Sequence, residues 1–264
     1  MSKSWKYLKP EGFVFPFDLL YTHFAFLTTR GDSVVIDRPI KAVLFDMYGT
    51  LLFEEGGLEL RYREMARLVG LDAESFIQAR DRSMHATMIG AIPDGVERAR
   101  IILRDMGFEP TEQQVFDLAK AEETVRIPAV HLYPATIPTL RALRKAGYRL
   151  GLISDCTYLW RPILLRLGLD SRFDAITLSC EAGLTKPDPS MYLTTCDLLG
   201  VKPEECIFVG DGGSDELQGA RALNIVAVLI DQEWGVSRQR EHGAHDFCIH
   251  SLGELLHLLP PQAA

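Results

Sequence analysis

Short apolar runs alternate with amphipathic segments along the chain from about residue 131 onward. The runs read as buried strands, and the segments between them carry apolar residues at helical spacing. Strands that alternate with helices form parallel sheets covered by helices on both faces. The predicted strands are 148–154, 173–179, 206–210, 225–230 and 246–250, and the predicted helices are 136–147, 158–168, 189–199, 214–223 and 251–259.

The first half of the chain contains one further strand, residues 43–45, and then a long stretch of helix-type patterning. Asp72 and Asp94 are typical first residues of helices, and another helix is expected to begin at Thr111 and to be stopped by Pro128. The sequence thus predicts a doubly wound, Rossmann-like α/β core that is interrupted after its first strand by a helical module. The predicted parts are an N-terminal extension of residues 1–40, a core of residues 41–57 and 131–264, and a helical module of residues 58–130.

The extension contains a run of aromatic and aliphatic residues at 13–27. This run is too short to span a bilayer and is interrupted by Pro16, Asp18 and His23. It lacks the basic start and the small-residue cleavage site of a signal peptide. We expect it to pack on the body of the fold, with a subunit contact as the alternative. A homodimer through this run or through the helical module is therefore one of the expectations.

Composition narrows the class of protein. The 264 residues are 47% hydrophobic and 24% charged, which is ordinary for a globular protein. The formal net charge of −8 argues against a nucleic-acid partner, which would need a clustered basic face. The five cysteines show no CxxC spacing, so a reduced, cytoplasmic protein with a small-molecule substrate and no membrane partner is expected.

Polar side chains follow the predicted strands at the point where each strand ends. Parallel sheets bind their ligands at the carboxyl ends of the strands, so these side chains are expected to meet at one edge. They are Asp46, Tyr48 and Thr50 after the first strand, Ser154 and Asp155 after the second, Lys186 after the third, and Asp211 and Asp215 after the fourth.

These residues resemble the motifs of the haloacid dehalogenase superfamily, in the same order and spacing over residues 41–55 and 133–230. The resemblance implies that Asp46 is a nucleophile, that Ser154 and Lys186 contact the substrate, and that the helical module is a mobile cap. Each motif is weak alone, but the ordered set is specific.

The chemistry of the side chains agrees with this resemblance. A carboxylate such as Asp46 can act as a covalent nucleophile. Asp46, Asp211 and Asp215 offer the oxygen ligands that Mg²⁺ requires. Lys186 is a point charge that holds the nucleophile ionised and meets an anionic oxygen, and Ser154 donates to another oxygen. Thr50 and Asp155 complete the expected substrate contacts.

A dinucleotide-binding loop is the rival interpretation of "GDGGSDE", since this segment follows a strand and precedes a helix. The Gly-x-Gly-x-x-Gly pattern fails because Asp215 stands at its sixth position. Asp211 would also place a negative charge against a pyrophosphate. We therefore expect no nucleotide cofactor at this loop.

Tyr48 departs from the phosphatase pattern of the superfamily, which has a second aspartate at this position. Asp-x-Tyr-Gly-Thr instead resembles the branch that removes halide from 2-haloacids without a metal. The acids Asp211 and Asp215 favour the phosphatase branch, because they and Asp46 would repel one another without a cation. The resemblance also implies that the main-chain carbonyl of Tyr48 is a metal ligand. We predict a Mg²⁺-dependent phosphatase that acts best on good leaving groups, with a metal-independent 2-haloacid dehalogenase as the alternative.

Substrate specificity is expected from the helical module. Arg80 and His85 are the polar candidates that we predict to bind substrate, and Met84, Met88 and Ile89 form the candidate apolar wall. A non-catalytic or regulatory binding protein with this fold is a further alternative, and Tyr48 is the one feature that favours it.

Overall fold

The core is a six-stranded sheet in which every neighbouring pair of strands is parallel. The structure is a computed structural model that describes residues 36–232 and 245–259. The predicted N-terminal run at 13–27 lies outside the described residues. The strand order is β5-β4-β1-β6-β7-β8, so the predicted doubly wound fold is confirmed. The strands are β1 (Ala42–Phe45), β4 (Arg149–Ser154), β5 (Ala175–Leu178), β6 (Cys206–Gly210), β7 (Val226–Ile230) and β8 (Phe247–Ile249).

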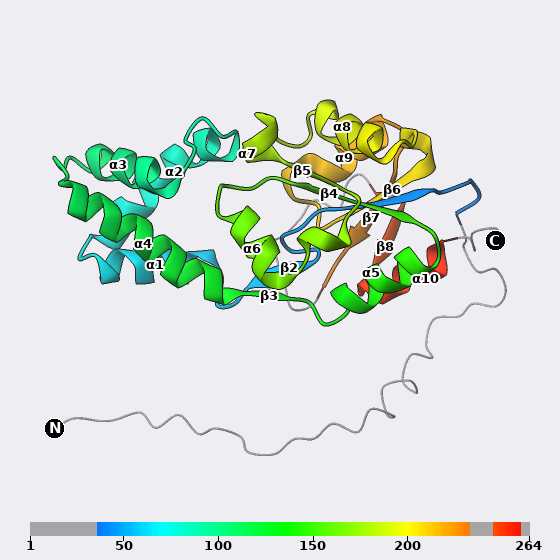
Figure 1. Cartoon of the computed structure of the whole chain (residues 1–264), viewed down its shortest axis with the longest axis horizontal. Coiled ribbons are helices and arrows are strands. Elements are labelled where there is room, and N and C mark those ends of the chain that lie inside the picture. Colours follow the sequence, from blue (N-terminus) through cyan, green and yellow to red (C-terminus); the bar gives the residue numbers. More distant parts are fainter. Residues whose placement is uncertain (1–35, 233–244, 260–264) are drawn as a thin grey trace, which may run out of the picture. The chain divides into compact units, whose positions relative to one another are not determined.

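Helices cover both faces of this sheet (Figure 1). Successive side chains of a strand point to opposite faces, and β1 shows this clearly. Val43 and Phe45 belong to the apolar cluster under one set of helices, and Ala42 and Leu44 belong to the cluster under the other. The first set is α5 (Thr136–Lys145), α6 (Trp160–Leu167) and α10 (Leu255–Leu258), and the second is α8 (Pro189–Leu199) and α9 (Glu216–Ala222). Shorter elements are α7 (Ser179–Ala182) and the 3₁₀ turns η1 (Asp170–Arg172), η2 (Pro203–Glu205), η3 (Gly213–Asp215) and η4 (Leu252–Glu254).

The stretch between the first two core strands forms a helical insertion with its own apolar cluster. Asp72 and Asp94 cap its second and third helices as predicted, because their carboxylates accept from the backbone N–H of Ser75 and Glu97. Pro128 lies in the last turn of the fourth helix and does not stop it, since the helix ends one residue later. The helices are α1 (Leu58–Leu68), α2 (Ala73–Met88), α3 (Gly95–Asp105) and α4 (Glu112–Ala129).

Two short strands, β2 (Leu52–Glu54) and β3 (Val130–Leu132), pair antiparallel where the chain enters and leaves the insertion. This pair was not predicted. It ties the two connections together, so the insertion joins the core directly beside the loop that follows β1.

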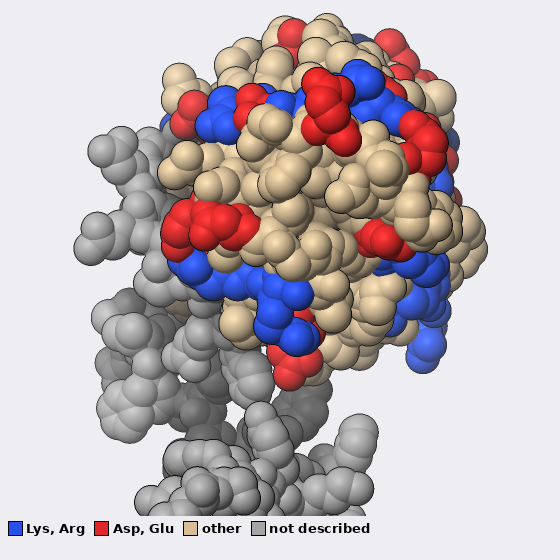
Figure 2. All heavy atoms as spheres, turned by 90° about the vertical axis from the view of Figure 1, so that its left-hand side faces the viewer, with Lys and Arg blue, Asp and Glu red and all other residues tan. Residues whose placement is uncertain are grey.

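Charged side chains on the outer end of the insertion are mixed in sign. Figure 2 shows basic and acidic residues in two bands on either side of a zone of other residues. Several of them are ion pairs between exposed or half-exposed partners, such as Arg63 with Glu59 and Arg82 with Asp105. Exposed pairs of this kind contribute little to stability. Among the described residues, no helix is long and apolar enough to cross a membrane.

Candidate active site

Asp46 lies directly beyond the end of β1, at the centre of the carboxyl edge of the sheet. Its backbone N–H donates to the carbonyl of Val209 at 2.9 Å, which continues the pairing between β1 and β6. Its side chain is buried. Gly49 is required in the loop that follows, because its φ is +82° and a Cβ there would lie 2.0 Å from an oxygen of Asp211.

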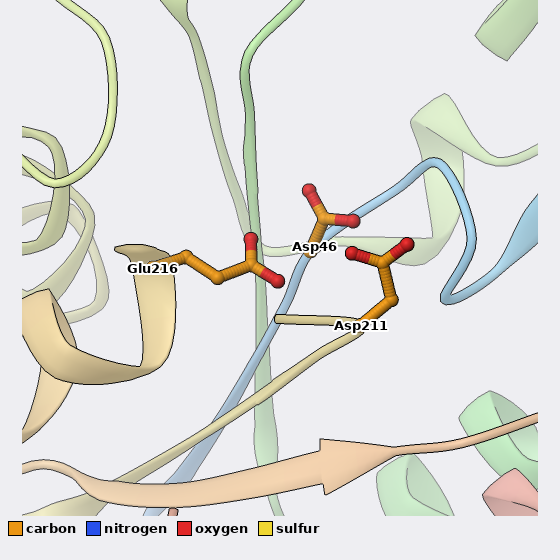
Figure 3. Close-up of side chains that lie close together, drawn as sticks. All are labelled: Asp46, Asp211 and Glu216. Atoms are coloured by element: carbon orange, nitrogen blue, oxygen red, sulfur yellow. The ribbon is translucent and has the colours of Figure 1, made fainter. Parts of the chain in front are cut away.

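Three buried carboxylates meet at this edge. Asp46, Asp211 and Glu216 each offer an oxygen, and these oxygens lie within 4.8 Å of one another. Figure 3 shows the three side chains converging from three separate segments of the chain. Asp46 follows β1, Asp211 follows β6, and Glu216 is the first residue of α9.

Lys186 is the cation that faces these acids. Its Nζ lies 2.5 Å from Oδ1 of Asp46 and also donates to Oε2 of Glu216. Burial lowers the pKa of the ammonium, but Asp46 and Glu216 outweigh this, so the pKa stands well above its usual value. The backbone N–H of Lys186 donates to Oδ1 of Asp155 at 2.9 Å, and this bond fixes the loop that carries the lysine.

The two carboxylates beside Lys186 are hard to ionise together. Burial raises the pKa of Asp46 to about 6, although Lys186 opposes the shift. Burial and the charge of Asp46 raise the pKa of Glu216 to about 8. With Asp211 included, three carboxylates share a single ammonium, so the ionised cluster carries two uncompensated negative charges. The cluster therefore favours the binding of a further cation.

The donor set fits a divalent cation of the magnesium type. Mg²⁺ prefers carboxylate and carbonyl oxygens, and it is usually held by one or two protein carboxylates with several waters. Asp46 and Asp211 supply such carboxylates on neighbouring strands. Glu216 is already engaged with Lys186, so it is better placed to orient the lysine than to bind the ion.

The structure does not bring the predicted acid Asp215 into this cluster. Its side chain is exposed, whereas the next residue, Glu216, is buried. The reason is the backbone of η3, because Ser214 and Asp215 both have positive φ, of 55° and 50°. This turn rotates Asp215 outward and directs Glu216 toward Lys186. Sequence reasoning missed Glu216, although it stands inside the quoted segment "GDGGSDE".

Three predicted substrate contacts beside the ends of β1 and β4 keep polar atoms that are buried without a hydrogen-bond partner among the described residues. They are the hydroxyls of Thr50 and Ser154 and one carboxylate oxygen of Asp155. Buried polar atoms normally have partners, so this concentration at the end of β1 and β4 is unusual. The hydroxyls can donate to an anionic ligand that enters beside Asp46.

A cavity of about 600 Å³ extends from the carboxylate cluster to the helical insertion. Arg80 lines its far end, together with the apolar side chains of Met84 and Met88. The other two predicted insertion residues lie elsewhere, since His85 is exposed on α2 and neither it nor Ile89 lines the cavity.

Arg80 is a buried cation with few compensating contacts. Its guanidinium stacks at 3.6 Å over the ring of Tyr62 and pairs at 2.7 Å with Asp81, whose side chain is 62% exposed. Its Nε has no hydrogen-bond partner among the described residues. Burial lowers the pKa of Arg80 to about 10, which reflects this incomplete compensation.

Two further arginines lie buried near Arg80, and acids compensate both. Arg126 contacts Glu54 at 3.2 Å and Glu122 at 3.7 Å, and Arg98 contacts Glu122 at 3.0 Å. Three arginines and two glutamates are buried here, and the third acid that pairs with an arginine, Asp81, is exposed. The cavity is thus acidic at the sheet, whereas its insertion end carries arginines together with Glu59, Glu74 and Asp81.

Tyr48 lies at the junction of these two ends. It is half-buried, lines the cavity, and packs edge-on against Trp160 with ring centroids 6.2 Å apart. The aromatic ring of Tyr48 thus forms part of the wall beside Asp46.

Comparison with known protein families gives one extended match. The model of haloacid dehalogenase-like hydrolases matches residues 40–224, which include the insertion and all of the residues described at the carboxylate cluster. A curated relative, the glyceraldehyde 3-phosphate phosphatase of Methanopyrus kandleri, is 30% identical over 72% of this chain and 84% of its own length.

Solved structures agree with this match. The chain resembles a HAD phosphatase from Thermococcus onnurineus with a TM-score of 0.60 and 28% identity, over 85% of this chain and 100% of that one. It also resembles a dehalogenase with a TM-score of 0.58 and 26% identity, over 85% of this chain and 98% of that one. Proteins named as a phosphatase and as a dehalogenase therefore both have a fold similar to that of this chain.

Proposed function

The chain belongs to the haloacid dehalogenase-like hydrolases, and we propose that it is a Mg²⁺-dependent phosphatase of small phosphorylated metabolites with Asp46 as its nucleophile. The phosphatases among its relatives and structural neighbours support this choice of reaction. Free thiols at all five cysteines support a cytoplasmic location.

The carboxylate cluster is the observation on which the proposal rests. Asp46, Asp211 and Glu216 are buried together with one lysine, and their uncompensated charge favours a bound cation. A dehalogenase that works without metal has no use for this excess of negative charge. Asp46, Asp211 and the main-chain carbonyl of Tyr48 are the proposed metal ligands. The predicted support from Asp215 would require its side chain to turn inward.

Each residue then has a role in two displacement steps. A carboxylate oxygen of Asp46 attacks phosphorus, the ester P–O bond breaks, and the alcohol leaves with a proton taken from solvent. Water then attacks the phosphorus of the aspartyl phosphate, which releases inorganic phosphate and restores Asp46. Lys186, Ser154 and Thr50 donate to phosphoryl oxygens. Bound Mg²⁺ would supply charge neutralisation to the phosphoryl group.

A 2-haloacid dehalogenase is the second candidate, and Tyr48 is the observation that favours it. A leaving halide needs no proton, so a tyrosine in place of a second acid does not hinder that reaction. In a phosphatase the same residue removes general-acid assistance, because a phenol with a pKa near 10 is a poor acid–base group at neutral pH.

Arg80 is the proposed recognition group for the end of the substrate that is not transferred. It lies buried at the insertion end of the cavity, its ion pair is with the exposed Asp81, and its Nε has no hydrogen-bond partner among the described residues. A carboxylate or second phosphate at the far end of the substrate would pair with its guanidinium fork. His85, exposed on α2, would take part only if the insertion moved.

One experiment separates the two reactions. The purified protein is assayed with p-nitrophenyl phosphate and with 2-chloropropionate, in EDTA and after the addition of Mg²⁺. We expect phosphate release that EDTA abolishes and Mg²⁺ restores, and no turnover in Asp46→Asn. Full turnover of the haloacid in EDTA would show that the enzyme is a dehalogenase.

A further inference from the structure

Two thiols lie in contact beside the active site. The Sγ atoms of Cys156 and Cys180 are 3.9 Å apart. Cys156 directly follows Asp155, which holds the loop of Lys186, and it lines the substrate cavity. Cys180 is in α7, at the end of the next strand of the sheet. The proposed catalysis uses neither thiol.

The segments that carry the two thiols are already joined through the side-chain hydroxyl of Ser179. Ser179, the neighbour of Cys180, accepts a hydrogen bond from the N–H of Cys156 at 2.8 Å and donates one to its carbonyl at 3.1 Å. The sulfur atoms must approach from 3.9 Å to the bond length of about 2.05 Å for a disulfide to form.

The two thiols of this pair also differ from each other in solvent exposure. Cys156 is buried, whereas Cys180 is partly exposed, so an oxidant in solution reaches the second thiol first. The contact from Cys156 lowers the pKa of the Cys180 thiol, and a thiolate is the form that reacts with oxidants.

A second pair in the same chain provides an internal comparison. Cys196 and Cys206 lie 3.8 Å apart, so their spacing is nearly the same. Both are buried, Cys196 in α8 with 1% exposure and Cys206 at the start of β6 with 0%. The sulfur–sulfur distance alone would make the two pairs equally ready to form a disulfide. The pairs differ in the access of a dissolved oxidant, because only Cys180 is partly exposed.

We propose that Cys156 and Cys180 form an oxidation-sensitive dithiol whose closure to a disulfide by hydrogen peroxide slows the enzyme. The Cys180 sulfur attacks one peroxide oxygen, the O–O bond breaks, and a sulfenic acid and water are formed. The Cys156 sulfur attacks the sulfenic sulfur and expels its oxygen as a second water, which takes up the thiol proton. Two thiols are thereby oxidised to one disulfide and one peroxide is reduced to two waters.

Closure of the bond disturbs two parts of the site. The loop at Cys156 continues from Ser154 and Asp155, so a shift there displaces the groups that face the phosphoryl site. The carbonyl of Cys180 also lies close against Gly90 of the insertion, where a Cβ would be 2.1 Å from it, so a shift of this carbonyl disturbs that contact. A displacement of about 1 Å in such groups costs up to roughly 10²-fold in rate.

The test treats the reduced full-length protein with hydrogen peroxide, in a Cys248→Ser background that removes the exposed fifth thiol. Peptide mass spectrometry maps the disulfide, and p-nitrophenyl phosphate turnover is measured before oxidation, after it, and after dithiothreitol. We expect a Cys156–Cys180 bond, a loss of turnover of roughly 10- to 100-fold, and recovery on reduction. Cys180→Ser should keep basal turnover and resist peroxide, whereas Cys196→Ser should remain sensitive.

The outcomes are distinguishable. A bond at Cys196–Cys206 instead, or a Cys156–Cys180 bond without loss of turnover, would overturn the proposal. The activity measurement rests on the proposed function, but the mapped bond does not. Absence of turnover in the reduced protein would therefore count against the phosphatase alone, and the mapped bond would still decide whether this dithiol is oxidised.

Discussion

At the scale of single residues, Lys186 shows how one side chain organises the site. Its ammonium lies between Asp46 and Glu216 and holds both in place. One ammonium offsets the charge of only one of the two carboxylates, so the ionised group of Lys186, Asp46 and Glu216 keeps a net negative charge. In the proposed mechanism the same lysine keeps Asp46 ionised for attack, and the remaining negative charge attracts the proposed cation.

Tyr48 separates the two candidate reactions. If the enzyme is a phosphatase that lacks a general acid, its rate should fall steeply as the pKa of the leaving group rises. Replacement of Tyr48 by aspartate should then raise the hydrolysis of alkyl phosphates by roughly 10²- to 10⁴-fold. The measurement is kcat/KM for a series of aryl and alkyl phosphates.

Tyr48→Phe is the matched control for this prediction. It keeps an aromatic ring that can pack against Trp160 and removes the hydroxyl alone, so it should leave the dependence on the leaving group unchanged. A flat dependence in the wild type, with loss of activity in Tyr48→Asp, would mean that Tyr48 binds substrate instead.

Arg80 should discriminate between substrates by charge. Arg80→Gln is expected to lower kcat/KM for phosphoglycolate by roughly 30-fold or more, since it removes one partner of a buried charge pair. The same variant should hydrolyse 2-hydroxyethyl phosphate, which has no carboxylate, nearly as well as the wild type. Steady-state kinetics on the two substrates measures the difference.

Arg82→Gln controls for the loss of an arginine from the same helix, because Arg82 is exposed and paired with Asp105. Arg82→Gln should leave kcat/KM unchanged for both substrates. An equal loss on both substrates in Arg80→Gln would assign Arg80 to the stability of the insertion and not to recognition.

At the scale of elements, the length of a segment decided what the sequence could predict. The core strands β4, β6 and β7 are continuous apolar runs between turn residues, so they were found. The strands β2 and β3 have three residues each, which is too short for an alternating pattern, and each exists only through its pairing with the other. A distant pairing partner leaves no local signal.

The turn between β6 and α9 limited the prediction of the site in a similar way. Two adjacent acids, Asp215 and Glu216, occupy this turn, and composition does not say which one points inward. The positive φ values at Ser214 and Asp215 make the choice. Such values are uncommon for residues other than glycine, so they are not expected from the sequence. The placement of Asp46, Lys186 and Asp211 needed only the ends of regular strands and the family resemblance.

A pair of variants tests this turn. At a pH above 8, where Glu216 is ionised, Glu216→Gln should lower kcat/KM by roughly 10-fold or more, because it removes the charge that holds Lys186 and lets the ammonium shift. Asp215→Asn should have little effect, since the Asp215 side chain is exposed. Activity is measured with p-nitrophenyl phosphate, and circular dichroism confirms that both variants fold. A comparable loss in Asp215→Asn would show that this side chain turns into the site during catalysis.

At the scale of the whole molecule, the proposed metal binding at the carboxylate cluster would be coupled to the stability of the fold. The raised pKa values of Asp46, about 6, and Glu216, about 8, exceed those of the unfolded chain, which are near 4. The folded metal-free protein therefore holds more protons than the unfolded chain between these values. The contribution of these two groups to the stability of the metal-free protein is therefore fully present below about pH 4 and is lost as the pH rises through 6 and then 8.

Mg²⁺ should reverse this loss, since it binds the ionised carboxylates of the folded state. At a concentration about 100 times its Kd it should contribute about 2.7 kcal/mol, which is an increase of roughly 5 to 10 °C in Tm for a chain of this size. The increase should be larger at pH 8 than at pH 5.5, because at acid pH protons compete for the Asp46 carboxylate. Thermal unfolding in EDTA and in Mg²⁺ measures it, with KCl of equal ionic strength and Asp211→Asn as controls. If Mg²⁺ leaves the Tm unchanged at both pH values, the carboxylate cluster does not bind Mg²⁺. A metal-independent dehalogenase would then explain Tyr48 better than a phosphatase does.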